Sequence, residues 1–243
     1  MSRTDLSLNT TFWFPGRWIG GLSLVIAPLL LLLAEVVLLP FDFFFPQQLK
    51  AFAEYPVRIS SGYSLFLAGN ILLWPAILTL THLIGRTKPG WAFWGGSFVM
   101  FGLFTRTFHY GINHLAFQLV HIQGVEQATK TIAGSYGGFH IVATFSMCIV
   151  LGWIILAIGA YLSGTLILIR AIALAVMSAL MLGVLKGSST MAVIATSGLC
   201  IALVPLGISI LTDKPRPSVR SILVWSLLII ILVAIMFISG QAG

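Results

Sequence analysis

One apolar stretch of the sequence, Trp91 to His121, carries five residues able to exchange protons or hydrogen bonds: Arg106, His109, Tyr110, Asn113 and His114. On a helix that turns about 100° per residue, Tyr110, Asn113 and Phe117 fall within about 40° of Arg106, and the two histidines flank them on either side. A helix facing lipid would not keep such a polar face. We therefore expect this face to be buried against protein or water.

A single acidic residue, Glu35, occurs within the long apolar stretches of the sequence. At a rise of roughly 1.5 Å per residue, Glu35 and Arg106 reach a similar depth of about 22–26 Å from the cytoplasmic ends of their helices. An ionised arginine inside a bilayer costs several kcal/mol unless a partner or water accompanies it. We expect Glu35 and Arg106 to face each other, either as an ion pair or through water.

Polar residues of two further apolar stretches are expected at a similar level. Asn70 lies about 10 residues from the outer end of the second stretch, and His140 lies near the outer start of the fourth, close in height to His114. The polar residues of four helices would then converge in the outer half of the membrane.

This set of residues supports acid–base chemistry on a hydrophobic or amphiphilic molecule such as an isoprenoid, a quinone or a lipid. Glu35 would be the proton donor or counter-ion, Arg106 the anchor for a negative head group or for Glu35, and His109 a proton relay. The other expected ligand-binding residues are Asn70, Tyr110, Asn113, His114, Phe117 and His140. If the molecule is turned over, the chain is a membrane-embedded enzyme of isomerase or cyclase type. Glu35→Gln should then spare folding and abolish ligand retention or turnover.

Three alternatives stay open at this point. Glu35, Arg106, Asn70 and Asn113 could form a structural polar lock, because interhelical hydrogen bonds commonly hold helix bundles together. The chain could be a small-solute transporter, or an immunity protein that sequesters a membrane-active peptide. For transport, proline residues within the spans are the candidates for helix breaks at mid-membrane.

The third alternative is a b-type haem or metal site in which His109 or His114 pairs with His140 across adjacent helices. His109 and His114 are five residues apart and point about 140° from each other, so at most one addresses a given cofactor. Haem is therefore not the favoured cofactor. The two cysteines, Cys148 and Cys200, form no metal motif.

The composition excludes a soluble protein. The chain has 243 residues, of which 58% are hydrophobic and 8% charged, and its mean hydropathy is +1.05, which indicates an integral membrane protein. The net charge of +7 reflects basic residues that flank the apolar stretches, so no nucleic-acid partner is expected. The expected partners are membrane lipids and a hydrophobic small molecule.

The apolar stretches predict an all-α fold, a single domain over residues 1–243 that forms a bundle of seven transmembrane helices. The predicted spans are residues 18–39, 61–84, 91–120, 137–162, 166–185, 190–211 and 219–239. Residues 40–60 are expected as a loop on the membrane surface, Glu126 and Lys130 in a short loop, and Lys186 in an interfacial loop. The positive-inside rule places the N-terminus in the cytoplasm and the C-terminus outside the plasma membrane.

Four short motifs lie between about residues 18 and 210: Ala34-Glu35, Val57-Arg58, Arg106 with Gly111-Ile112-Asn113, and Gly137-Gly138-Phe139. In these motifs the chain resembles a bacterial family of multi-pass proteins of unknown function. The resemblance implies a bacterial plasma membrane and a helical bundle, without a reaction.

In size and helix count the chain is also similar to the seven-span membrane terpene cyclases. These begin catalysis with an intramembrane acid, for which Glu35 is the candidate, whereas Asp213 is on the wrong side to be their second acid.

Overall fold

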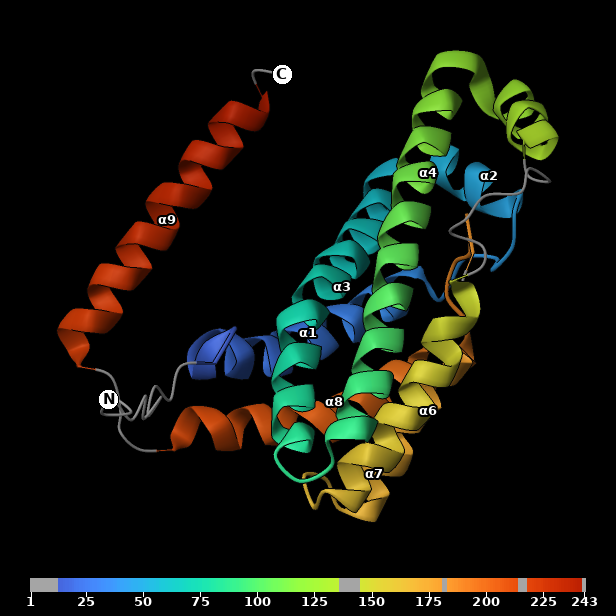
Figure 1. The fold of residues 1–243 in the computed structure, drawn as a ribbon. Helices are drawn as coiled ribbons and strands as arrows, with labels where there is room; N and C mark the ends of the chain where they lie inside the picture. Colours follow the sequence, from blue (N-terminus) through green and yellow to red (C-terminus); the bar gives the residue numbers. More distant parts are fainter. Residues whose placement is uncertain (1–12, 136–144, 181–182, 214–217, 242–243) are drawn as a thin grey trace, which may run out of the picture. The chain divides into compact units, whose positions relative to one another are not determined.

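The computed structural model describes residues 13–135, 145–180, 183–213 and 218–241, and within these ranges every regular element is a helix (Figure 1). The predicted all-α class is therefore confirmed for the described residues. The elements are α1 (Gly16–Leu38), α2 (Gln47–Glu54), α3 (Pro56–Gly85), α4 (Pro89–Ser135), α6 (Ser146–Leu162), α7 (Leu168–Ala175), the 3-10 helix η1 (Val176–Ala179), α8 (Thr190–Thr212) and α9 (Val219–Gln241). The chain forms two compact units, Met1–Leu211 and Thr212–Gly243.

Three of the described helices are long and apolar enough to cross a membrane, namely α1, α3 and α8. Shorter apolar helices occupy Ser146–Leu162, Leu168–Ala179 and Leu223–Ser239, the last within α9. Large apolar side chains are exposed along the outer face of α1, at Leu22, Ile26, Leu29, Leu33 and Val36. In water such a continuous apolar face would be unfavourable, so it favours a lipid environment.

Two predicted loops are wrong, because short amphipathic helices occupy them. Residues 40–60 contain α2 and the first turn of α3, and α2 buries Leu49 and Phe52 on one face. The α4 helix continues beyond its predicted end at Val120, changes direction at Gly124 (φ 76°, ψ 165°) and ends at Ser135. In both segments the buried apolar residues are three or four positions apart, Leu49 and Phe52 in α2 and Ala128 and Ile132 near the end of α4, which is the spacing of one helix face.

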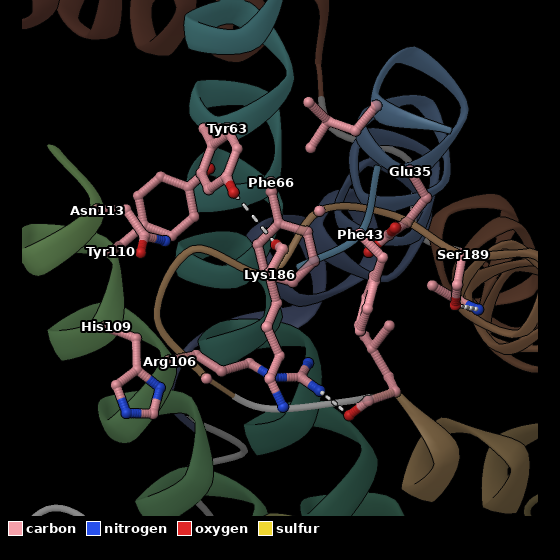
Figure 2. A pocket seen from close by; sticks show the side chains of 15 residues that line it. Glu35, Phe43, Tyr63, Phe66, Arg106, His109, Tyr110, Asn113, Lys186 and Ser189 are labelled. Atoms are coloured by element: carbon pink, nitrogen blue, oxygen red, sulfur yellow. Dashed lines mark hydrogen bonds between the residues drawn. The ribbon is translucent and has the colours of Figure 1, made fainter. Parts of the chain in front are cut away.

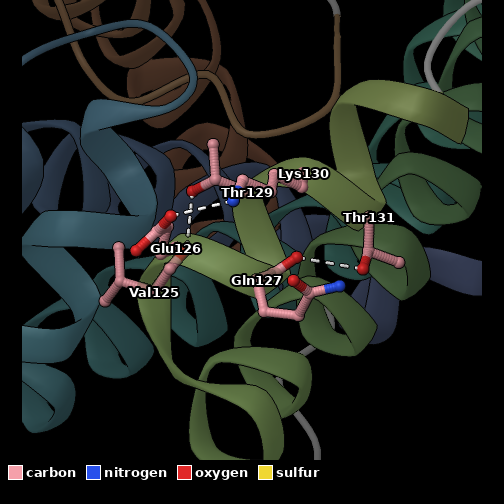
Figure 3. A network of polar contacts seen from close by, with 6 residues as sticks. All are labelled: Val125, Glu126, Gln127, Thr129, Lys130 and Thr131. Atoms are coloured by element: carbon pink, nitrogen blue, oxygen red, sulfur yellow. Dashed lines mark hydrogen bonds and ion pairs between the residues drawn. The ribbon is translucent and has the colours of Figure 1, made fainter.

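The last part of α4 is held by local polar contacts. Figure 3 shows Lys130 paired with Glu126 at 2.8 Å, one helical turn apart, and Thr129 Oγ1 donating to the carbonyl oxygen of Val125 at 2.7 Å. On the opposite side, Ala128 and Ile132 are buried. This amphipathic segment is therefore a packed helix rather than a loop.

The predicted fifth span, residues 166–185, is not a continuous helix. The α7 helix ends at Ala175 and η1 at Ala179. Beyond them, Gly183 (φ 154°) and Leu185 (φ 51°) have left-handed backbone conformations. We call residues 183–189, which lead from this break into α8, the η1–α8 segment.

The α4 and α6 helices approach closely through glycines spaced seven residues apart, Gly95 and Gly102 on α4 and Gly152 and Gly159 on α6. A Cβ atom at any of the four would come within 2.1–2.8 Å of an atom of the other helix. The two helices lie side by side (Figure 1). Small residues thus allow the two backbones to touch, as is common in membrane bundles.

Gly102→Ala is expected to destabilise the protein by about 1–3 kcal/mol, because the new Cβ would lie 2.1 Å from Cβ and 2.7 Å from Cα of Ile149. The matched control is Gly111→Ala on the same helix, where a Cβ meets no atom within 4 Å. This control should gain roughly 0.5–1 kcal/mol from the higher helix propensity of alanine. Thermal unfolding in detergent, followed by circular dichroism, measures the Tm of both variants. Equal changes in Tm for Gly102→Ala and Gly111→Ala would contradict the close packing.

The buried apolar residues of the first unit form two clusters, one containing Leu31, Leu103 and Leu180 and the other Leu38 and Ala116, among other residues. Several chain segments pass from one cluster to the other. Buried polar residues, among them Glu35 and Arg106, lie on these segments between residues of the two clusters, and they belong to the candidate site.

Candidate functional site

Glu35 and Arg106 occupy equivalent places between the two apolar clusters. On α1, Glu35 lies between Leu31 of the first cluster and Leu38 of the second. It is part of the buried face of the helix, directly beside Ala34. On α4, Arg106 follows Leu103 of the first cluster by one turn. The helical periodicity of both segments therefore turns the two charged residues inward at the same level.

These residues line a cavity of about 60 Å³ in the first unit. Its walls come from α1, α3, α4, the start of α8, the η1–α8 segment and Phe43 (Figure 2). The labelled side chains are Glu35, Phe43, Tyr63, Phe66, Arg106, His109, Tyr110, Asn113, Lys186 and Ser189. Since a water occupies about 30 Å³ in the liquid, the cavity has room for a few waters or for a compact polar head group.

The Arg106 guanidinium is buried with most of its hydrogen-bonding capacity unused. The residue is 4% exposed, and Nη2 donates to the carbonyl oxygen of Leu180 at 3.2 Å. Nε and Nη1 have no hydrogen-bond partner among the described residues. The guanidinium carbon lies 5.9 Å from the centre of the Phe66 ring, a contact that favours a cation. Buried donors of this kind are costly unless a partner satisfies them.

Glu35 is also 4% exposed, and its Oε2 atom has no hydrogen-bond partner in the described part of the chain. Of the two expected arrangements, an ion pair or a contact through water, the direct ion pair is not formed: no carboxylate oxygen of Glu35 lies within 4.0 Å of an Arg106 nitrogen among the described atoms. The two groups instead contribute to the walls of one cavity. A contact between them through a bridging group stays a prediction.

Lys186 is a cavity residue that the sequence analysis assigned to an interfacial loop. Its side chain lines the cavity with that of Arg106 (Figure 2) and packs against Gly183, which has space for it because it lacks a side chain. The described lining of the cavity thus includes two cationic side chains and one acidic side chain. The signal that could have located Lys186 is the glycine on either side of it, at 183 and 187, which is atypical of a helix interior.

The η1–α8 segment is fixed by hydrogen bonds from three other parts of the fold. The amide of Leu185 donates to Asn113 Oδ1 at 2.7 Å, and the amide of Gly187 donates to the carbonyl oxygen of Phe43 at 2.9 Å. Tyr63 Oη donates to the carbonyl oxygen of Lys186 at 3.2 Å. Irregular backbone inside a helical bundle needs such partners, because its own peptide groups do not pair.

Asn113→Ala is expected to destabilise the protein by about 1–3 kcal/mol, because the buried amide of Leu185 loses its acceptor. The loss should be local, with faster hydrogen exchange in peptides covering residues 183–189. Gln118→Ala, at an exposed position of the same helix, is the matched control. Unchanged exchange in these peptides would show that Asn113 does not hold the segment.

The other predicted site residues are divided among several places. His109 and Tyr110 line the cavity. The side-chain amide of Asn70 donates to Leu103 O at 3.2 Å and Thr107 Oγ1 at 3.0 Å, in the contact between α3 and α4. Phe117 stacks on Phe52 with ring centres 4.5 Å apart. His140 lies outside the described residues.

A second hollow, of about 490 Å³, runs along the α3 and α4 helices beside the cavity. We call it the α3–α4 groove. Its wall includes Phe117 and the exposed His114, and it shares Tyr63, Tyr110 and Asn113 with the wall of the cavity. The sequence predicts one pocket for Tyr110, Asn113, His114 and Phe117, whereas the structure divides these four residues between two adjoining hollows.

The described residues contain no group of three or more His, Cys, Asp and Glu side chains that could hold a metal ion. Fold and site together define an all-helical protein with a small polar cavity between two apolar clusters. Comparison with models of protein families, with curated proteins and with solved structures finds no match. The two resemblances drawn from sequence motifs and helix count stay predictions.

Proposed function

We propose that this chain is an integral membrane protein of seven passes whose cavity binds the polar head group of an amphiphilic small molecule. The passes are α1, α3, α4, α6, the α7–η1 region with the η1–α8 segment, α8 and α9. The first two passes run in opposite directions: Gly20 of α1 opposes Thr79 of α3, and Gly69 of α3 opposes Leu31 of α1. This opposite direction and the apolar outer face of α1 support the topology, with the N-terminus on the cytoplasmic side of a plasma membrane.

The observation that carries the proposal is the buried Arg106 guanidinium at the cavity, two of whose nitrogens have no hydrogen-bond partner in the described part of the chain. A charge held away from water is costly unless it is paired, and a residue serving only stability would be expected to have its donors satisfied. Preformed but unsatisfied donors around a hollow are the arrangement that a polar ligand group completes. At about 60 Å³, the cavity fits a head group and excludes a hydrocarbon tail.

Acid–base turnover of the bound molecule is the second part of the proposal. The Glu35 carboxyl group and the His109 imidazole line the cavity with Arg106. A carboxyl group and an imidazole within reach of one polar group can deliver and remove its protons. In this scheme Arg106 positions the head group, Glu35 exchanges a proton with it, and His109 relays that proton.

The broken fifth pass favours transport of a small solute as a second candidate function. Transporters place discontinuous helices at their binding sites, and here the backbone from Gly183 to Ser189 is irregular and lines the cavity. Solute flux into liposomes containing the purified protein, abolished by Arg106→Met, would favour transport over ligand binding alone.

Mass spectrometry of an organic extract tests the binding proposal. Wild type, Arg106→Met and Arg86→Met are purified in parallel in mild detergent; Arg86 is exposed at the end of α3 and serves as the matched control. We expect one amphiphilic compound at a stoichiometric level in wild type and in Arg86→Met, and its loss in Arg106→Met. Equal retention of bulk lipids by all three proteins would overturn the proposal.

A further inference from the structure

The charges around the cavity indicate the sign of the head group. Arg106 and Lys186 are cationic and Glu35 is the acidic side chain among the described lining residues, so the formal charge of the lining is positive even with Glu35 ionised. No direct ion pair within 4.0 Å joins these described groups. An anionic group in the cavity would balance the charge and accept hydrogen bonds from the Arg106 guanidinium.

The α3–α4 groove offers a place for the rest of the molecule. Its volume of about 490 Å³ lies within the range of small-molecule sites, roughly 300–1,000 Å³, and is about eight times that of the cavity. Leu67, Phe52 and Phe117 give it apolar walls. Tyr63, Tyr110 and Asn113 line both hollows, so the cavity and the groove adjoin at these side chains.

We propose that the ligand is a single-chain amphiphile with a carboxylate or phosphate head, whose head binds beside Arg106 and Lys186 and whose tail lies in the α3–α4 groove. This inference rests on the proposed binding function and adds the class of ligand and the course of its tail. Phe117 and Leu67 then contact hydrocarbon, and Tyr110 lies where head and tail join.

Gly111 provides the test, because it lies in the wall of the groove and a Cβ built there meets no atom within 4 Å. Gly111→Trp should fill the groove without contacting the cavity, and Gly111→Ala is the matched control that leaves the groove open. The full-length delipidated protein is titrated in non-ionic detergent with four probes: oleate, oleyl phosphate, methyl oleate and butyrate. Calorimetry measures binding, and thermal unfolding verifies that each variant is folded.

We expect wild type and Gly111→Ala to bind oleate or oleyl phosphate at least about tenfold more tightly than methyl oleate or butyrate. Gly111→Trp should lose at least about tenfold in affinity for the long-chain anion and keep its weak affinity for butyrate. Equal affinity for oleate and methyl oleate would show that the head group need not be anionic. An unchanged affinity of Gly111→Trp for oleate would show that the tail does not lie in the groove. If anions of every chain length bind equally well and binding still requires Arg106, the tail does not lie in the groove. The proposed function, binding of a polar head group in the cavity, is then unaffected. If none of the four probes binds, both the proposed binding function and the anionic amphiphile are contradicted.

Discussion

Arg106→Met is expected to leave the stability of the ligand-free protein within about 1 kcal/mol of wild type, or to raise it, while removing ligand binding. In the wild type Arg106 is 4% exposed, and among the described residues its guanidinium makes one hydrogen bond, to Leu180 O. A buried charge that has no direct ion-pair partner is costly, and replacing it by an apolar side chain of similar volume removes that cost. The lost hydrogen bond to Leu180 opposes that gain, so the two contributions largely offset each other.

The same substitution distinguishes a binding site from a structural polar lock. If Arg106 served mainly to hold α4 against α1, its removal would leave Glu35 buried without its partner and cost about 3–5 kcal/mol. Thermal unfolding of the delipidated protein, with and without oleate, measures both effects. Oleate should raise the Tm of wild type, because a ligand that binds only the folded state stabilises it, and should not change that of Arg106→Met. A large loss of stability without ligand would favour the lock; Arg86→Met controls for removal of an exposed positive charge.

The inward placement of Glu35 and Arg106 could be predicted from the sequence because two simple rules agree on it. Helical periodicity puts Arg106 on one face with Tyr110 and Asn113, and the cost of a charge in lipid requires that face to be buried. Counting residues from the helix ends then puts Glu35 at the level of Arg106. Both side chains line one cavity in the structure.

The role of Lys186 could not be predicted in the same way, because it depends on where an apolar stretch stops being helical. Residues 166–185 are apolar enough to be read as one helix, yet the helix ends at Ala175 and the 3-10 turn at Ala179. The break is stabilised by distant partners, among them Asn113 and the carbonyl oxygen of Phe43. Such long-range hydrogen bonds leave no periodic signal in the sequence.

The division of the predicted pocket into a cavity and a groove also depends on packing. The sequence analysis grouped His114 and Phe117 with the residues of the cavity, but they line the groove. Asn70 reaches the expected level on α3, and its amide group donates to Leu103 O and Thr107 in the helix contact. Depth along a helix can be counted from sequence, whereas the direction of a side chain between two neighbouring helices depends on their separation.

Glu35→Gln is expected to increase the affinity for oleate by about tenfold. If the head group is anionic, the Glu35 carboxylate at the same cavity repels it, and the neutral amide has nearly the same volume. At an effective dielectric constant of about 20, like charges that share one small site repel by on the order of 1–4 kcal/mol, which corresponds to at least about a tenfold change in affinity. This expectation differs from the loss of retention that the sequence alone suggested, because the cavity also holds Lys186.

The Glu35→Gln variant also distinguishes two roles for Glu35, counter-ion and proton donor. An amide can form hydrogen bonds but cannot transfer a proton to the ligand at neutral pH. If Glu35 takes part in turnover, the variant should hold oleate or the natural amphiphile tightly and leave it chemically unchanged. If Glu35 only neutralises part of the positive charge, the variant and the wild type should yield the same compound on extraction. The variant should contain more of it. Glu54→Gln, an exposed acid at the end of α2, provides the control for loss of a negative charge elsewhere. A Glu35→Gln protein that folds and binds oleate more weakly than wild type would contradict the anionic head group and make Glu35 a direct ligand of the bound molecule.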